Sequence, residues 1–504
     1  MDSEKFYITT TLPYVNAAPH IGFALEIVQA DVVARSMAKR GKEVFFNTGT
    51  DEHGLKIYQK ALEEKKDPQA YCDEYAEKFS LLKEKLNLSY NNFIRTTDTS
   101  HIKAAQEFWK RCEANGDIYK ASYKAKYCVG CELEKTDSEL VEGRCPIHPN
   151  KELEAIEEEN YFFRFSKYQK PLLDFYEANP DFVIPDTKQN EIYNFVREGL
   201  QDFSISRLKE KMPWGVPIPG DEKHVMYVWF DALVNYISCL GWPASAKAMA
   251  GEARSGEARS GEARKFEQFW GTKEKRNAVQ VAGKDNLRQQ TAMWQAMLMS
   301  AGLPNSKQVF IHGYITSSGQ KMSKSLGNVV DPIFLVDKYG TDAVRYYLLR
   351  EIPGWDDGDF SEEKFKQRYN GDLAGGLGNL LSRTLAMAKK LDAQEEEPQK
   401  ELKIKIQEAE KKSFEQTDLY KFNEALASIW DLAAFCDRII ERERPWEKEE
   451  SLIEKNKKAI GEILFALRRI SEMAEPFLPK TSLEIRKQLE SKKPEPLFPR
   501  INNG

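Results

Sequence analysis

The sequence lacks long apolar runs and contains few cysteines. No apolar stretch approaches the roughly 18 residues that would cross a bilayer, and Met1–Glu4 does not begin a charged-then-apolar leader, so we expect a cytoplasmic protein with no membrane partner. Three of the seven cysteines are clustered and four are scattered. This pattern is not typical of a disulfide framework, and it favours a reducing compartment with one metal site.

An excess of either charge is also missing. The 74 basic and 79 acidic side chains leave a formal net charge of −5. This balance neither supports nor excludes a nucleic-acid partner, because an RNA-binding protein need only be basic over the surface that meets the RNA. The 504 residues leave room for roughly three or four domains of about 100–200 residues each.

The start of the chain predicts a βαβ unit. Residues 6–10 and 44–51 have the composition of buried strands, and apolar residues at helical spacing predict a helix from about 21 to 40. The start of this helix offers free N–H groups and a partial positive charge to a phosphate. His20 can donate a hydrogen bond there, and Gly22 allows close approach. We therefore expect a nucleotide at the carboxyl edge of the sheet.

A second phosphate-binding element is predicted at residues 319–327, Gly-Gln-Lys-Met-Ser-Lys-Ser-Leu-Gly. Lys321 and Lys324 flank small hydroxyl residues, and the terminal glycines permit backbone movement. Such a loop can hold a polyphosphate while negative charge develops on it and then release it. Taken alone, the segment has the alternative interpretation of a solvated basic turn.

Together, residues 19–22 and 319–327 resemble the HIGH and KMSKS motifs of class I aminoacyl-tRNA synthetases. The resemblance implies that the catalytic residues are His20, Lys321 and Lys324, and that ATP is bound by His20, Gly22 and Lys324. Phe23 stands where this family usually has a second histidine, so it is left out of the site.

Two further stretches, residues 11–16 and 49–54, resemble the methionyl-tRNA synthetase family specifically. The resemblance implies that Leu12 and Tyr14 line a methionine pocket and that Asp51 binds the α-ammonium group. A carboxylate just past a strand end suits a cationic ligand, although a helix-capping aspartate looks the same in isolation.

Cys128-x-x-Cys131 is followed after thirteen residues by Cys145-x-x-His148. Two such turns predict one zinc ion with four protein ligands, which makes a closed and therefore structural site. The alternative is three buried thiols and a surface histidine. The methionyl family carries such a knuckle in a connective domain, and the resemblance implies this insertion at 116–212. That length is too short for the large editing domain of the valyl, isoleucyl and leucyl enzymes.

Residues 226–236 are predicted to form a helix with Trp229, Ala232, Leu233 and Tyr236 on one face. A stripe of this kind usually faces a core. The resemblance implies instead that these side chains surround the methionine side chain. A thioether has almost no hydrogen-bonding capacity, so shape and sulfur–aromatic contacts would select it.

The strand predicted at 279–283 ends in a turn, where the resemblance implies that Gly283 and Asp285 bind the ATP ribose. Gln289 and Gln290 depart from the family pattern, which often has Phe-His here with the histidine near the methionine sulfur. A glutamine still offers a hydrogen-bond donor, so we expect Gln290 to remain part of the methionine site.

From about residue 373 the periodicity is helical almost to the end, which predicts a helix bundle. It resembles the anticodon-binding domain of methionyl and related synthetases, and the matching anticodon contacts are Asn379, Arg383 and Trp446. Arginine and tryptophan suit the recognition of unpaired bases. A lone tryptophan in a helical protein is nevertheless more often part of the core.

The resemblance covers nearly the whole chain. It implies an α/β fold with a Rossmann-type parallel-sheet catalytic domain, split by a zinc-binding connective insertion and followed by an all-α anticodon-binding helix bundle. The expected parts are 1–115 and 213–330 (the two catalytic halves), 116–212 (the connective insertion), 331–372 (a stem-contact linker) and 373–504 (the anticodon-binding domain). A Gly-Glu-Ala-Arg-Ser repeat at 251–264 is expected to be an exposed insertion without a catalytic part.

The implied activity is a methionine–tRNA ligase that makes methionyl adenylate from L-methionine and ATP and then charges tRNA(Met). The implied cofactors are one structural Zn²⁺ and Mg²⁺ with ATP. We expect a monomer, because the chain ends at Gly504 without the oligonucleotide-binding domain that dimerises some relatives.

Two alternatives stay open at this point. A cysteinyl enzyme would use an open zinc site to bind a thiolate, which four protein ligands argue against. A tRNA-binding paralogue without catalysis is suggested by Phe23 and by Gln289 and Gln290.

Overall fold

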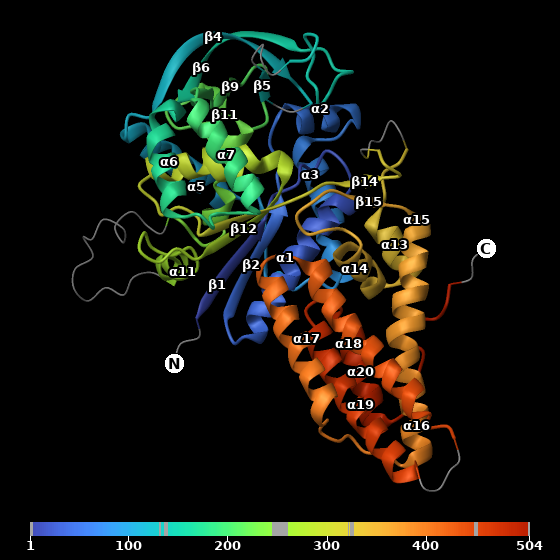
Figure 1. Ribbon diagram of the computed structural model, residues 1–504. Coiled ribbons are helices and arrows are strands. Elements are labelled where there is room, and N and C mark those ends of the chain that lie inside the picture. Colours follow the sequence, from blue (N-terminus) through green and yellow to red (C-terminus); the bar gives the residue numbers. More distant parts are fainter. Residues whose placement is uncertain are drawn as a thin grey trace.

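The computed structural model describes residues 4–130, 133–135, 140–243, 261–320, 322, 327–447 and 452–501. Its centre is a six-stranded parallel sheet with the order β3-β2-β1-β12-β13-β7 (Figure 1). The strands are β1 (Lys5–Thr10), β2 (Glu43–Thr50), β3 (Asn92–Arg95), β7 (Val183–Ile184), β12 (Ala278–Gly283) and β13 (Gln308–His312). Because β1 pairs with both β2 and β12, two distant parts of the chain complete one sheet. The predicted parallel-sheet fold is confirmed.

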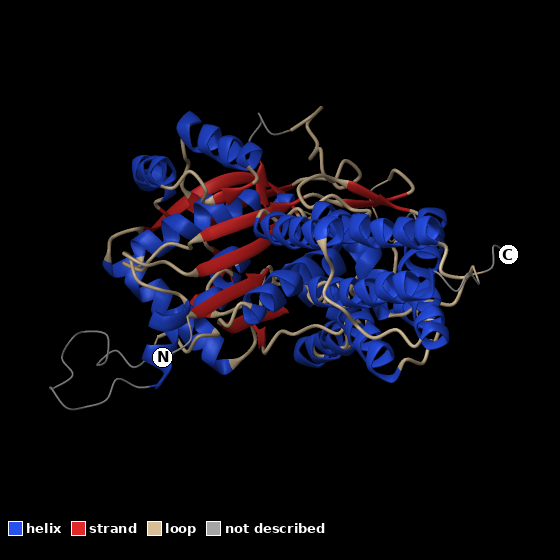
Figure 2. Ribbon diagram, turned by 60° about the horizontal axis from the view of Figure 1, so that its bottom comes forward, coloured by secondary structure: helices blue, strands red, loops and turns tan. Residues whose placement is uncertain are grey.

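Helices cover both faces of this sheet (Figure 2). Successive residues of β1 enter different cores: Phe6 and Ile8 pack with α1 (Ile21–Lys39), whereas Tyr7 packs with α5 (Thr99–Ala114). All residues of β12 are buried, as expected for a strand covered on both faces. This double coverage explains the continuous apolar runs that predicted the strands. Further helices of this part are α2 (Leu55–Glu63), α3 (Pro68–Ser80), α4 (Leu82–Lys85), α11 (Gly261–Phe269) and α12 (Trp294–Ser300).

The middle segment forms two small antiparallel sheets beside the main one. One has the order β5-β4-β6-β8, and its strands are β4 (Ile118–Cys128), β5 (Leu133–Lys135), β6 (Glu154–Phe163) and β8 (Phe203–Ser204). The other consists of β9 (Ser206–Leu208), β10 (Pro217–Ile218) and β11 (Asp221–Met226), and the helices here are α6 (Gln169–Ala178) and α7 (Asp186–Glu198). The same segment also gives the main sheet its edge strand, because β7 pairs with β13.

The last part of the chain is a helix bundle, as predicted (Figure 1). It consists of α16 (Asn379–Leu391), α17 (Lys400–Asp418), α18 (Phe422–Glu443), α19 (Ile453–Ala474) and α20 (Pro479–Ser491). Before it lie α13 (Pro332–Tyr339), α14 (Thr341–Arg350), α15 (Glu362–Arg368) and the paired short strands β14 (Ile315–Ser317) and β15 (Gly358–Phe360). No helix among the described residues combines the length and the apolar character needed to span a membrane.

The predicted exposed repeat lies mostly outside the described residues. Only residues from 261 onward are described, and there the chain is already helical, as α11. Arg264, at the end of the predicted repeat, is exposed. The expectation of an exposed insertion without a catalytic part stays a prediction for residues 251–260.

A buried arginine joins the catalytic fold to the bundle. Arg345 on α14 forms an ion pair with Asp31 on α1 at 2.8 Å, and both side chains are fully buried. The guanidinium also donates to the carbonyls of Leu86, Pro476 and Phe477 at 2.8–3.1 Å. Burial alone would raise the pKa of Asp31, but the charges of Arg345 and Arg35 and the hydrogen bonds from Ser89 together outweigh it, so the pKa is lowered.

We expect Arg345→Met to destabilise the protein by about 3–5 kcal/mol, because it leaves a buried carboxylate without its main partner. A matched control is Arg40→Met, which removes the partly exposed pair with Asp418 across the same interface and should cost less than about 1 kcal/mol. Urea denaturation followed by circular dichroism measures both. Since the pKa of Asp31 is depressed, the wild-type advantage should be complete above about pH 4 and shrink below it. Equal losses in the two variants would contradict this account.

Candidate active site

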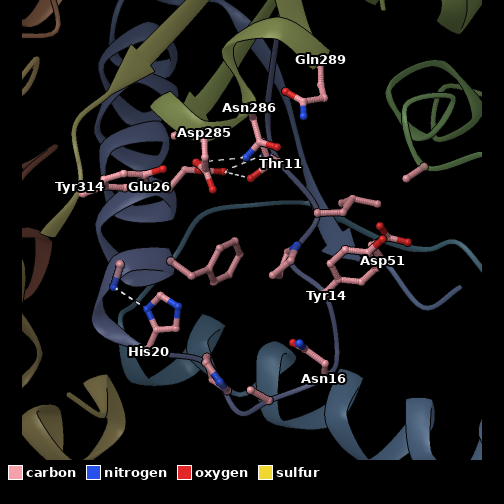
Figure 3. A pocket seen from close by; sticks show the side chains of 18 of the residues that line it. Thr11, Tyr14, Asn16, His20, Glu26, Asp51, Asp285, Asn286, Gln289 and Tyr314 are labelled. Carbon is pink, nitrogen blue, oxygen red and sulfur yellow. Dashed lines mark hydrogen bonds between the residues drawn. The ribbon is translucent and has the colours of Figure 1, made fainter. Parts of the chain in front are cut away.

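A cavity of about 570 Å³ opens at the carboxyl ends of β1, β2, β12 and β13 (Figure 3). The predicted site residues that line it are Leu12, Tyr14, His20, Gly22, Asp51, Trp229, Ala232, Leu233, Tyr236, Gly283, Asp285 and Gln290. They were predicted from separate motifs, and the fold brings them to one cavity. This edge is where open α/β sheets bind ligands.

The start of α1 differs from the prediction. Its first N–H groups are not free: Ile21 donates to the Val330 carbonyl at 3.0 Å, and Gly22 donates to Nδ1 of His20 at 3.0 Å. The expectation of free N–H groups for a phosphate is therefore wrong here. The reason is that His20 caps the helix itself, with an extended backbone and its ring folded over Gly22.

This cap determines the proton position on His20. Because Nδ1 accepts the hydrogen bond from Gly22, the proton of the neutral ring lies on Nε2. The ring is exposed at the cavity, and desolvation by the nearby cavity wall lowers the pKa of His20. His20 is thus a neutral donor. A Cβ at residue 22 would lie 2.8 Å from the His20 ring, which explains the need for glycine.

Glu26 and His312 form a buried charged pair on one wall of the cavity. Glu26 lies 3.0 Å from Nε2 of His312, whose Nδ1 donates to the Gly313 carbonyl at 2.7 Å. Burial alone would lower the pKa of His312, but the hydrogen bond and charge of Glu26, together with the Gly313 carbonyl and the charge of Asp285, outweigh it and the pKa is raised. The other oxygen of Glu26 accepts from the backbone and hydroxyl of Thr11 at 2.7 and 2.6 Å, so the carboxylate is fixed.

Asp51 and Tyr14 lie side by side at the other end of the cavity (Figure 3). Asp51 is buried directly after β2, and Val15 donates its N–H to the carbonyl of Asp51 at 3.2 Å. Lys56 also lines the cavity, with its ammonium group 6.0 Å from the centre of the Tyr14 ring. A buried carboxylate in this position suits a ligand cation.

The predicted helix over 226–236 is broken. It consists of α8 (Val228–Ala232) and α9 (Asn235–Ser238), joined by a turn. Asn235 donates its side-chain amide to the Ala232 carbonyl at 2.7 Å, where a continuous helix would place the backbone N–H of Tyr236. Leu233 and Val234 keep right-handed helical dihedral angles, so the predicted residues still face one cavity.

Gln290 is held by its neighbours. Its amide nitrogen donates to the Tyr236 hydroxyl at 2.6 Å, and its oxygen accepts from Gln280 at 3.2 Å. An amide nitrogen carries two hydrogens, so one donor remains for a ligand. Phe23, the second departure from the family pattern, packs edge-on against Phe79 at 5.5 Å, and both rings line the cavity.

Sequence reasoning missed several residues of the cavity wall, including Glu26, Lys56, Asn286 and His312. Glu26 was detectable in principle, because it is a charged residue within a helix that is buried on nearly every side. The other three carry no comparable local signal.

Most of the predicted lysine loop lies outside the described residues. Lys321 and Lys324 lie outside the described residues, as does Cys131 of the zinc knuckle. The flanking residues Ser318 and Gly319 have positive φ angles of 53° and 74°, which is a tight turn after β14. Met322 lines the cavity.

Three of the four predicted zinc ligands lie close together. The ligand atoms of Cys128, Cys145 and His148 all lie within 4.8 Å of one another. A Cβ at Gly130 would lie 2.5 Å from the His148 ring, so the chain closes tightly around this cluster. Two thiols and an imidazole in such a cradle fit a zinc ion. Ile147 and His148 also line the cavity, which places the knuckle in its wall.

The predicted anticodon residues gather on the bundle. Asn379 and Arg383 lie on α16, and the Arg383 guanidinium is 5.9 Å from the centre of the Trp446 ring. Trp446 is 43% exposed, so it is not a core residue. Arg383 also pairs with Glu441 at 2.7 Å. This group of an exposed amide, a half-buried guanidinium and an exposed indole can stack on and hydrogen-bond to bases.

We expect the purified protein to contain about one zinc ion per chain, and Cys145→Ser to lose most of it, because three remaining ligands hold zinc poorly. Elemental analysis by mass spectrometry after gel filtration measures the metal. Cys436→Ser is the control, since Cys436 is a buried thiol in the bundle, outside the cluster. Unchanged zinc in Cys145→Ser would refute the site.

Two family models match the chain. One, described as tRNA synthetases class I (M), matches residues 6–155 and 149–385, and another, the anticodon-binding domain of tRNA ligase, matches 399–498. The methionine–tRNA ligases of Thermotoga maritima and Nostoc sp. are each 42% identical to it. These alignments cover 95% and 96% of this chain, and 74% and 90% of those proteins.

Solved structures agree. Methionyl-tRNA synthetase of Mycobacterium tuberculosis in complex with methionyl-adenylate is similar to this chain with a TM-score of 0.87 and 34% identity. The similarity covers 99% of this chain and 100% of that chain. The chain therefore belongs to the methionyl class I tRNA synthetases.

Proposed function

We propose that this protein is a methionine–tRNA ligase. In the first step the methionine carboxylate attacks the α-phosphorus of ATP, and pyrophosphate leaves. In the second step a hydroxyl of the terminal tRNA ribose attacks the methionyl carbonyl, and AMP leaves. The observation that carries the proposal is that residues from five separately predicted stretches, 11–16, 19–22, 49–54, 226–236 and 279–290, line one cavity.

The cavity has a polarity that fits methionyl adenylate. Asp51 would bind the α-ammonium group, while the thioether would lie among Trp229, Ala232, Leu233, Tyr236 and the remaining donor of Gln290. Gly283 and Asp285 would bind the ribose, since carboxylates accept hydrogen bonds from sugar hydroxyls. His20 would donate from Nε2 to phosphate oxygens. Leu12 and Tyr14 would close the amino-acid end.

Catalysis in this arrangement is positioning and charge stabilisation. The described wall of the cavity contains three carboxylates, Glu26, Asp51 and Asp285, with one lysine, Lys56, and one histidine paired with Glu26, His312. It thus offers no excess of positive charge to a triphosphate. Lys321 and Lys324 would supply it to the departing pyrophosphate, and Mg²⁺ would accompany ATP.

A zinc ion would be held by Cys128, Cys131, Cys145 and His148. With four protein ligands it has no open position, so it would stabilise the fold of the connective segment and, through Ile147, the cavity wall. Asn379, Arg383 and Trp446 would contact the anticodon of tRNA(Met). The domain limits given above and a monomeric state remain our predictions.

The proposal is tested by amino-acid-dependent ATP–pyrophosphate exchange without tRNA, across all twenty amino acids. We expect exchange with methionine alone. Exchange with cysteine or another amino acid would contradict the reading of the pocket. No exchange, in a folded and zinc-loaded sample, would favour a tRNA-binding paralogue without catalysis.

We expect Gly22→Ala to slow this exchange on the order of 10²-fold, because the new methyl group displaces the His20 ring and removes a positioned donor. The KM for methionine should change little, since Asp51 and the thioether pocket lie elsewhere in the cavity. Gly371→Ala is the control: no atom lies within 4 Å of its added Cβ. A wild-type rate for Gly22→Ala would show that His20 is not used.

A further inference from the structure

A buried carboxylate lies behind the cavity and contacts two histidines. Asp231 on α8 is fully buried, and its oxygens lie 2.7 Å from Nδ1 of His53 and 2.8 Å from Nε2 of His101. The other nitrogen of His101 is 2.9 Å from the Ser238 hydroxyl on α9. This His53–Asp231–His101 cluster therefore joins the turn after β2, α5, α8 and α9.

The protons in the cluster follow from its geometry. A carboxylate can only accept, so Nδ1 of His53 and Nε2 of His101 both carry a proton. Burial alone would raise the pKa of Asp231, but the charge of His53 and the hydrogen bonds from both histidines lower it to about 2. Asp231 is therefore ionised throughout the physiological range, and it holds both rings.

The cluster connects the two halves of the amino-acid site. Asp231 directly precedes Ala232 and Leu233, which line the thioether end of the cavity. His53 lies two residues after Asp51, which lies at the ammonium end. Between them, Glu52 fixes the turn from the other side, by an ion pair with Arg95 at 2.7 Å.

The two helices that carry the thioether-binding residues, α8 and α9, are short and need contacts that hold them in place. α8 and α9 together span only residues 228–238, and the hydrogen-bonding of Asn235 interrupts them. Helices of one turn are not stable on their own, so contacts with the rest of the fold must fix them. The buried polar contact here is made by Asp231, whose carboxylate contacts His53, two residues after Asp51, and His101 on α5.

We propose that the His53–Asp231–His101 cluster sets the separation between the ammonium-binding and thioether-binding halves of the site, so that His53 and His101 are positioning residues for amino-acid selection. This inference rests on the proposed function. Without His53, α8 shifts against Asp51, and the pocket no longer matches the length of the methionine side chain.

The test is ATP–pyrophosphate exchange by His53→Ala with methionine and with norleucine, which replaces the sulfur by a methylene. We expect the KM for methionine to rise about tenfold or more and the preference for methionine over norleucine to fall by a similar factor, because small misplacements are costly. The KM for ATP should stay within about twofold. His53→Asn should restore much of the wild-type preference, since its amide nitrogen can take the place of Nδ1.

His224→Ala is the matched control, because His224 is a buried histidine with an aspartate partner, Asp221, outside the cavity. Equal effects of His53→Ala and His224→Ala, or a wild-type preference in His53→Ala, would overturn the inference. If His53→Ala does not fold, the preference for methionine over norleucine is measured in His101→Gln and His53→Asn instead. A preference in His53→Asn that is as low as in unrelated destabilised variants would also overturn the inference. Failure of the proposed function is separate, because the wild-type protein would then show no methionine-dependent exchange.

Discussion

Asp31 and Arg345 form an ion pair from which water is excluded, and much of the molecule is arranged about it. Neither charge can be buried alone without a large cost, so α1 and α14 have one relative position. The remaining donors of Arg345 satisfy carbonyls of the bundle. Since α1 also carries His20 into the cavity, the same interaction connects the helix bundle to the candidate active site.

The cavity itself is shaped by side chains that already have partners. His20 caps its own helix, Glu26 is held by Thr11 and His312, and Gln290 is held by Tyr236. Such groups are pre-organised, so they need little rearrangement when a ligand binds. The described wall is acidic, which suits an ammonium group and ribose hydroxyls but not a triphosphate. This explains why the lysines expected to act on pyrophosphate belong to a separate loop.

The sequence was sufficient for the fold class and for twelve of the residues that line the cavity, because both depend on short motifs and local patterns. Apolar runs predicted β1, β2 and β12, and short motifs predicted His20, Asp51 and Gly283. What it could not predict depends on long-range contacts. The capping of α1 by His20, the break that Asn235 causes between α8 and α9, and the Glu26–His312 pair all require partners that local patterns do not reveal.

The most direct test of this account is a crystal structure of the protein with a non-hydrolysable methionyl adenylate analogue. We expect the ammonium group to contact Asp51, the thioether to lie between Trp229 and Tyr236, and the ribose to contact Asp285. An analogue bound in the reverse orientation, or outside this cavity, would contradict it.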